Sequence, residues 1–216
     1  MAGDLADVRS LTAGDDRSAL LAELWHAWLS YGRKIGPDAW EQHSGIGEWS
    51  VKELFGHVAR QIGVLEDMLR RATSRTAAAV DFPTAADYFA NFRDWREEAS
   101  ALSARTAVVY AVDHSTAHMI AEFERAGDVV ALLSESLDQV LPTPFGTATA
   151  RGYLTTRVVE ATVHLVDLQR ALGLAEHVPE RASEVTALLL LEMCPRQAFI
   201  DAATGRGRTD FLPVLV

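Results

Sequence analysis

The chain has 216 residues, of which 20 are basic and 30 acidic, so its formal net charge is −10. Apolar residues make up 49% of the sequence and charged residues 23%, a balance typical of a globular protein with a full core. This composition excludes disorder for most of the chain, and the length indicates one domain of ordinary size. Because an acidic surface repels phosphate and no run of Lys or Arg forms a basic stripe, we expect no nucleic-acid partner.

The sequence also argues against a membrane or secreted protein. It has no run of about 18 to 20 uninterrupted apolar residues, the length that a helix needs to cross a bilayer. Its first residues, MAGDLADV, include acids where a secretory signal would be basic and then apolar. Cys194 is the only cysteine, which excludes an internal disulfide, and we interpret it as a small buried side chain. We therefore expect a cytoplasmic protein.

The N-terminal half of the chain predicts two amphipathic helices. The first spans about 16–34 and ends before the Gly-Pro pair at 36–37. The second spans about 51–71, where apolar residues recur three and four positions apart. Ser50 and Glu53 form the S-x-x-E pattern in which each side chain binds the other's free backbone N–H, and this marks the helix start.

Segment 72–112 predicts a long crossover that carries its own shorter helix over 84–102. A third long helix is expected to follow Asp113 as its N-cap and to run to about residue 139. The crossover therefore separates the second and third helices of the predicted bundle.

A fourth long helix is expected from Thr147, as its N-cap, to Gly173, which stands where a helix-ending glycine belongs. After it, 182–203 is helical with an interruption at Pro195. Four long helices without an alternating strand pattern predict an all-α four-helix bundle. We expect 1–216 to form a single helical domain, with 174–216 as a short C-terminal extension.

One pair of side chains on the fourth predicted helix has the spacing of metal ligands. Glu160 and His164 are four residues apart, so their side chains stack on one helix face and can reach one ion. His57, at the edge of the apolar face of the second helix, could supply a third ligand. Two imidazoles and a carboxylate suit Zn²⁺ or a similar ion and leave a coordination position open. The spacing alone also fits a solvated pair, and His57 alone fits a hydrogen-bonded core histidine.

A second pair of histidines has the same spacing. His114 and His118 stand near the start of the third predicted helix. His114 would occupy the first helical position, where the helix dipole disfavours a cation. The residues alone leave this pair open as a competing site.

Two sequence blocks resemble a known family. GEWSVKELFGHVA, followed later by RGYLTTRVVEATVHLVDLQRALG, resembles the mycothiol-dependent maleylpyruvate isomerases, a branch of the DinB-like metalloenzymes. The resemblance covers most of the chain and implies a DinB-like four-helix bundle. In that family the first block ends in a metal-binding histidine, which corresponds to His57, and the second supplies Glu160 and His164. The resemblance thus implies one divalent ion, Zn²⁺ or Ni²⁺, held by these three residues.

The resemblance also implies an activity. The ion would bind the sulfur of mycothiol, or of another low-molecular-weight thiol, and the thiolate would isomerise or conjugate a small electrophile. We therefore expect a thiol-utilising isomerase or S-transferase, a monomer or homodimer, whose partners are a small-molecule substrate and a thiol. A metal-dependent hydrolase or tailoring enzyme that activates water stays open, as does a non-catalytic bundle that binds a small molecule.

Two more side chains on the fourth helix are candidate catalytic residues. Arg157 could orient Glu160 or meet an anionic substrate. Asp167 could accept the second N–H of the His164 imidazole. Both also fit ordinary ion pairs. Members of the family carry a C-terminal domain that helps to close the substrate site. In this chain only the segment from Cys194 onward resembles that later region. This departure weakens the expectation of isomerase activity more than the expectation of a metal site.

Overall fold

The structure is a computed structural model that describes residues 17–74, 80–92, 96–134, 137 and 139–207. In chain order, its elements are α2 (Arg17–Gly32), η1 (Pro37–Glu41), α3 (Val51–Arg70), β1 (Thr73–Ser74), α4 (Ala85–Ala90), α5 (Arg96–Asp113), α6 (Thr116–Glu124), α7 (Ala126–Ser134), β2 (Gln139–Thr143), β3 (Gly146–Thr149), α8 (Ala150–Ala171), α9 (Glu180–Met193) and α10 (Arg196–Ala203).

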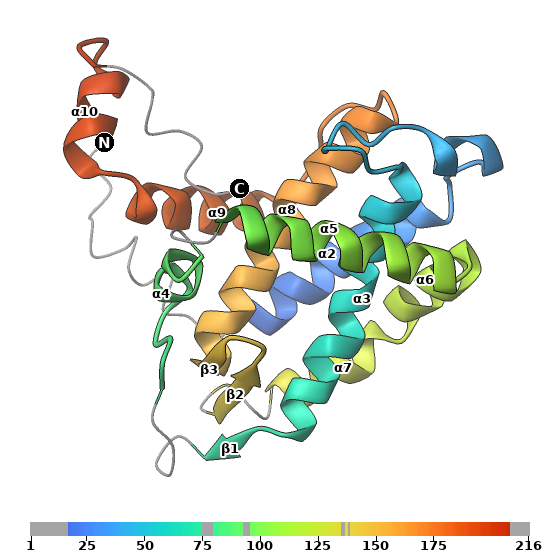
Figure 1. Cartoon of the computed structure of the whole chain (residues 1–216), viewed down its shortest axis with the longest axis horizontal. Helices are drawn as coiled ribbons and strands as arrows, with labels where there is room; N and C mark the ends of the chain where they lie inside the picture. Colours follow the sequence, from blue (N-terminus) through green and yellow to red (C-terminus); the bar gives the residue numbers. More distant parts are fainter. Residues whose placement is uncertain (1–16, 75–79, 93–95, 135–136, 138, 208–216) are drawn as a thin grey trace.

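The core is a bundle in which α8 and the α6–α7 segment each pack against both α2 and α3 (Figure 1). The buried Trp28 of α2 joins three of these elements. Its indole nitrogen donates to the carbonyl of Ala161 in α8 at 3.0 Å, and its ring lies 5.5 Å from Phe55 of α3 and 5.9 Å from Phe123 of α6. The predicted all-α bundle is confirmed.

The start of α3 is the best-predicted boundary. Ser50 and Glu53 form the predicted capping box, with both reciprocal bonds present. Gly56 brings neighbouring helices close, because a Cβ on it would lie 3.1 Å from the Met119 side chain and 3.3 Å from Tyr110. The N-terminal turns of α3 are therefore held at both the cap and the packing surface.

The third predicted helix is wrong in its bounds. Asp113 is not an N-cap but the last residue of α5, and the crossover contains α4 and α5 in place of one helix over 84–102. Ser115 caps the next helix instead, accepting a hydrogen bond from the backbone N–H of His118. The segment after it is divided into α6 and α7, and the chain is already extended in β2 at the end of the predicted helix.

The fourth predicted helix starts later than expected, at a different cap. Thr147 lies in strand β3 and its hydroxyl donates to Asp81 at 2.8 Å, so it is not free to cap α8. Thr149 caps α8 by accepting from the N–H of Gly152 at 3.0 Å and also donates to the carbonyl of Pro83. The C-terminal prediction is confirmed: Gly173 has φ of +64° just beyond α8.

A small antiparallel sheet, not predicted from the sequence, closes one end of the bundle (Figure 1). Strands β1, β2 and β3 lie in that order, with Val140 opposite both Thr73 and Thr149. The C-terminal end of α3 and the N-terminal end of α8 both meet this sheet, so the two helices run in opposite directions.

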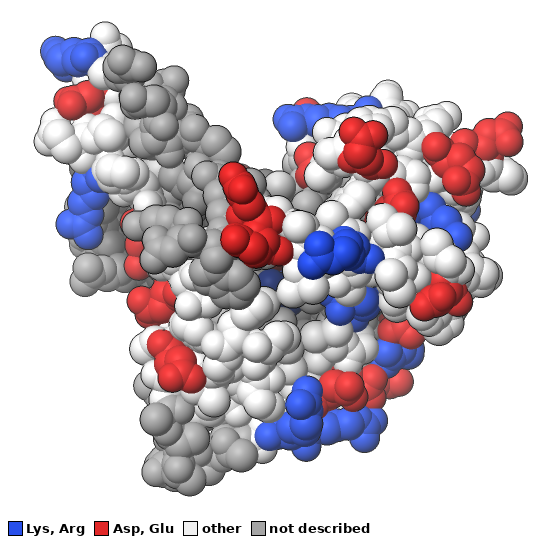
Figure 2. Space-filling model, in the orientation of Figure 1, with Lys and Arg blue, Asp and Glu red and all other residues white. Residues whose placement is uncertain are grey.

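The C-terminal helices extend from the bundle. α9 packs on α8 and α4, and α10 projects away from the bundle at the far end of α9 (Figure 1). The predicted break at Pro195 separates the two helices. None of the helices in the described ranges has the length and apolar character required to cross a bilayer. Acidic and basic side chains are interspersed on the face in Figure 2 and form no basic stripe among the described residues there.

Candidate metal centre

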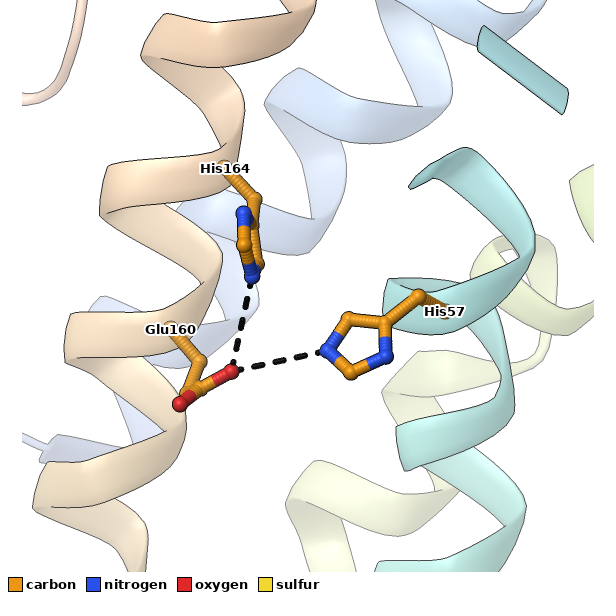
Figure 3. A group of neighbouring side chains, drawn as sticks. All are labelled: His57, Glu160 and His164. Carbon is orange, nitrogen blue, oxygen red and sulfur yellow. Dashed lines mark ion pairs between the residues drawn. The ribbon is translucent and has the colours of Figure 1, made fainter. Parts of the chain in front are cut away.

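Helices α3 and α8 bring the three predicted ligands together (Figure 3). His57 points from the second turn of α3, and Glu160 and His164 point toward it from successive turns of α8. One carboxylate oxygen, Oε2 of Glu160, lies 3.5 Å from Nε2 of His57 and 3.6 Å from Nε2 of His164. One ligand atom from each residue lies within 4.8 Å of the other two, a geometry that could hold a metal ion.

The spacing of these atoms fits a metal better than it fits hydrogen bonds. Both nitrogen–oxygen distances exceed the range of roughly 2.7–3.2 Å that is usual for an N–H···O bond. Four ligands at about 2.0–2.1 Å from a tetrahedral ion are separated from each other by about 3.4 Å. The donor set of two imidazoles and one carboxylate also suits Zn²⁺ or a similar ion and leaves a fourth position for another ligand.

Neighbouring side chains orient the two imidazoles. Nδ1 of His164 lies 3.1 Å from Oδ2 of Asp167, so this carboxylate accepts the second imidazole N–H and directs Nε2 toward the other candidate ligands. The ring of Trp49 lies 5.1 Å from His57 and 6.4 Å from His164, covering both. Nδ1 of His57 is buried and has no hydrogen-bond partner among the described residues, so its orientation depends on packing.

The three candidate ligands, His57, Glu160 and His164, form a triad in which the charge of each residue affects the pKa of the others. Burial lowers the pKa of His57, so its imidazole is neutral at pH 7. Burial opposes ionisation of Glu160, but the two imidazoles and the charge of Arg157 outweigh it and hold the pKa of Glu160 well below its usual range. Burial also opposes the charged form of His164, yet Asp167 and Glu160 raise its pKa to about 9. A bound metal ion would have to displace this proton.

Arg157 lies beside the triad without an ion-pair partner among the described residues. Its guanidinium carbon lies 4.9 Å from the centre of the Tyr153 ring, and its Nε donates to the hydroxyl of Thr156. With Trp25, His57 and Glu160 it lines a small pocket between α2, α3 and α8. Within the described residues Arg157 forms no ion pair of the ordinary kind, whereas Oδ2 of Asp167 faces the second imidazole nitrogen of His164.

The competing histidine pair has a different arrangement. His114 lies between α5 and α6, not in the first turn of a helix, and its ring stacks on that of His118 with centres 4.4 Å apart. Nε2 of His118 lies 3.7 Å from Glu122, whose carboxylate also binds Arg125. In the described ranges these residues do not form a group of three converging donors.

The sequence pattern assigns no role to two residues near the triad, Trp49 and Arg60. Trp49 stands at the start of a helical pattern, and only the folded chain shows that it covers the imidazoles. Arg60 lies three residues after His57, and its Nε is buried without a partner among the described residues. A signal for Arg60 exists in the sequence, because its spacing from His57 mirrors that of Arg157 from Glu160.

Comparisons with known proteins agree with this arrangement. The family model described as "Mycothiol maleylpyruvate isomerase N-terminal domain" matches residues 21–169, which is more than half of the chain. The matched segment contains α3 and most of α8, and therefore all three residues of the triad. Searches of curated proteins and of solved structures gave no match.

Proposed function

The chain belongs to the mycothiol maleylpyruvate isomerase N-terminal domain family, and from this premise we propose that it is a divalent-metal-dependent enzyme that uses a small thiol. The metal, Zn²⁺ or Ni²⁺, would be held by His57, Glu160 and His164. The co-substrate would be mycothiol or another low-molecular-weight thiol, and the substrate a small electrophile that is isomerised or conjugated.

The observation that carries this proposal is the convergence of three ligand atoms from two helices at distances suited to one ion. A bound divalent ion would lower the pKa of a thiol and hold it as a thiolate at neutral pH. Asp167 accepts the Nδ1–H of His164 and keeps Nε2 available. The ring of Trp49 packs beside the two imidazoles, with its centre 5.1 Å from that of His57 and 6.4 Å from that of His164.

The reaction itself is redox-neutral. The thiolate sulfur forms a bond to one alkene carbon of an electrophile such as maleylpyruvate, and the electron pair of the double bond moves onto the conjugated carbonyl oxygen. Rotation about the new single bond followed by cleavage of the C–S bond gives the trans isomer and returns the thiolate. If a proton is added to the adjacent carbon instead, the product is a stable S-conjugate.

The test uses the full chain loaded with Co²⁺ as a spectroscopic replacement for Zn²⁺. Mycothiol should produce an intense sulfur-to-metal charge-transfer band, and the same mixture should consume maleylpyruvate faster than mycothiol alone. Glu160→Gln should abolish both effects through loss of the ion. An unchanged spectrum together with hydrolysis of an ester or amide without thiol would overturn the proposal in favour of a hydrolase. Absence of metal binding would overturn it in favour of a non-catalytic bundle.

A further inference from the structure

Helix α5 carries its larger apolar side chains on the side that points away from the bundle. It lies across the outer side of α3 (Figure 1), and among its described side chains only the small Ala107 and Ala111 are buried. On the opposite side, Leu102, Val109 and Val112 are 46%, 58% and 76% exposed. A helix on the surface of a monomer normally has the reverse arrangement, with its large apolar side chains toward the core. Helix α5 therefore has two apolar sides, and the bundle covers only one of them.

The outward side chains form one continuous surface, here called the α5 face, which consists of Leu102, Val108, Val109 and Val112. Helical spacing places these residues on the same side, because they lie three, four or seven positions apart. The described ranges contain ten exposed large apolar side chains, and four of them belong to this face. Figure 2, in the orientation of Figure 1, shows mostly uncharged side chains over the helix. Single exposed apolar residues are ordinary on a protein surface, whereas a contiguous group marks a contact surface.

Helix propensity gives no reason for this choice of residues. Valine is a poorer helix former than alanine or lysine, since its branched Cβ loses rotational freedom against the preceding turn. Three valines on the solvent side of one helix therefore lower its stability unless another surface packs on them. The residues of the α5 face fit a helix that is covered on both sides.

The charged side chains of α5 are arranged in an order that suits a second copy of the same helix. The exposed Glu97 and Glu98 precede the α5 face, the exposed Arg105 lies within it, and the exposed Asp113 ends it. A parallel pair of α5 helices would place the two Arg105 side chains against each other. An antiparallel pair separates them and also brings opposite ends of the two helix dipoles together. The charges therefore favour antiparallel pairing.

An antiparallel pair around a twofold axis level with residue 107 matches the apolar residues as well. Leu102 of one copy then lies opposite Val112 of the other, and the reverse contact follows from the symmetry. Arg105 lies four residues along the axis from the level of the second copy's Asp113, a rise of about 6 Å that an arginine side chain can span. The α5 face is thus complementary to itself in both shape and charge.

The size of the surface predicts a transient contact. An 18-residue helix is about 27 Å long and, with side chains, about 10 Å wide. Two such helices side by side cover less than the roughly 800 Å² per partner of a standard interface, even where the exposed Ala117 and His118 of α6 extend the contact. Interfaces of this class are weak, so we expect a dissociation constant of about 10 to 100 µM.

We propose that the α5 face is the contact surface of a homodimer, in which α5 packs antiparallel on the α5 helix of a second copy of this chain. The inference goes beyond the proposed function and does not depend on the metal, because the residues of the face belong to neither α3 nor α8.

The first test is sedimentation equilibrium of the full chain, with Zn²⁺ and with a chelator, at about 1 to 300 µM protein, which brackets the expected dissociation constant. At about 0.15 M NaCl the screening length of about 8 Å limits the repulsion between two chains of net charge −10. The average mass should rise from 23.6 kDa toward twice that value in both samples. Leu102→Asp should raise the dissociation constant at least tenfold, since it places a charge opposite an apolar side chain.

Leu174→Asp is the matched control, because Leu102 and Leu174 are both 46% exposed and Leu174 lies beyond the end of α8. This variant should dimerise as the unchanged protein does, and circular dichroism should show both variants folded. A chain that stays monomeric at every concentration would overturn the proposal. A dimer that Leu102→Asp and Leu174→Asp weaken equally, or that neither weakens, would also overturn it, because the contact would then lie elsewhere.

Disulfide cross-linking tests the orientation of the two helices. In a Cys194→Ala background, proteins with Leu102→Cys and with Val112→Cys should form a disulfide-linked dimer when they are mixed with diamide as oxidant, and each alone should form far less. A disulfide requires Cα atoms within about 7 Å of each other, so it reports which residues face one another. Efficient linkage of Val112→Cys to itself would overturn the antiparallel arrangement. Absence of any linkage in a sample that sediments as a dimer would overturn the assignment of the contact to α5.

Discussion

Two clusters in the described part of the chain combine a pair of histidines with a glutamate, and they differ in what surrounds them. His57, Glu160 and His164 come from two helices, and the His57 side chain is only 6% exposed. His114, His118 and Glu122 come from one stretch of chain, and the His118 side chain is 45% exposed. The first cluster has ligand atoms that converge, whereas the second has stacked rings.

The difference shows that i, i+4 spacing is not sufficient for a metal site. In the first cluster Asp167 orients the ring of His164, and the Glu160 oxygen lies between the two Nε2 atoms. In the second, Glu122 is already bound by Arg125, so its charge is neutralised without a metal. A third donor from another helix, and a carboxylate not occupied by an arginine, distinguish the candidate metal site from a surface pair.

The largest effect expected is on metal content. His57→Ala and His164→Ala should each reduce the metal bound by the purified protein from about one ion per chain to near zero, because either change leaves two ligands where an open catalytic site requires three. Elemental analysis measures the loss, and far-ultraviolet circular dichroism should show the helical signal nearly intact.

The matched control for these variants is His114→Ala in the other cluster. It removes a histidine of similar spacing that has no converging third ligand in the described ranges, so metal content should stay unchanged. A loss of metal in His114→Ala, with none in His57→Ala, would assign the ion to the α5–α6 junction and reverse the roles of the two clusters.

The next largest effect is expected from Asp167→Asn. The neutral amide no longer stabilises the His164 ring as a carboxylate does, and loss of such an outer partner typically lowers metal affinity by about 10- to 100-fold. Competition with a chelator of known affinity measures the change. Glu122→Gln, which alters the carboxylate beside His118, should have no effect on metal affinity, and equal losses in both variants would indicate a general electrostatic effect.

A third prediction concerns pH. In the metal-free protein the pKa of His164 is raised to about 9, so below that pH a proton occupies the ligand that the metal needs. Apparent metal affinity should therefore rise by about tenfold per pH unit as the pH increases toward 9 and level off above it. The raised pKa also stabilises the metal-free fold, fully below about pH 6.5 and progressively less up to pH 9.

Chelator competition at several pH values tests this dependence, and Tm measurements on the metal-free protein test the stability change. The Tm of the metal-free protein should fall between about pH 6.5 and 9, and this fall should disappear in His164→Ala. An affinity that does not change over this range would show that His164 is already neutral and that Asp167 does not hold its proton.

The helix boundaries could be predicted from the sequence where only one capping signal was present, and not where two candidate caps stood close together. The α3 boundary was predictable because Ser50 and Glu53 together indicate one start. At α8, both Thr147 and Thr149 could cap, and the choice is decided by Asp81, which is distant in sequence and binds Thr147. The third predicted helix is divided at Arg125 into α6 and α7, and the Arg125 side chain binds Glu66 of α3, again a partner distant in sequence.

The candidate site was predictable to a similar extent. Helical periodicity placed Glu160 and His164 on one face and His57 at the edge of the apolar face of another helix. The family resemblance paired the three, although only the folded chain shows the three ligand atoms near one another. The burial of Arg60 could not be predicted, because a lysine or arginine on a helix is normally solvated. The burial of its Nε depends on the packing of α3 against α5 and α8, which no local pattern records.

The smallest effect expected comes from the serine caps that begin the helices of the two clusters. Ser50 accepts the N–H of Glu53 at the start of α3, which carries His57, and Ser115 accepts the N–H of His118 at the start of α6. Ser50→Ala and Ser115→Ala should each lower the free energy of unfolding by about 1 kcal/mol, as is typical for the loss of an N-cap side chain, measured by urea denaturation of the metal-free protein. Only Ser50→Ala should also weaken metal binding, and only slightly, since fraying of the first turn of α3 loosens His57 without removing it. Equally weakened metal binding in both variants would show that metal affinity follows the overall stability of the protein. The proposed difference between the two histidine clusters would then depend on the ligand substitutions alone.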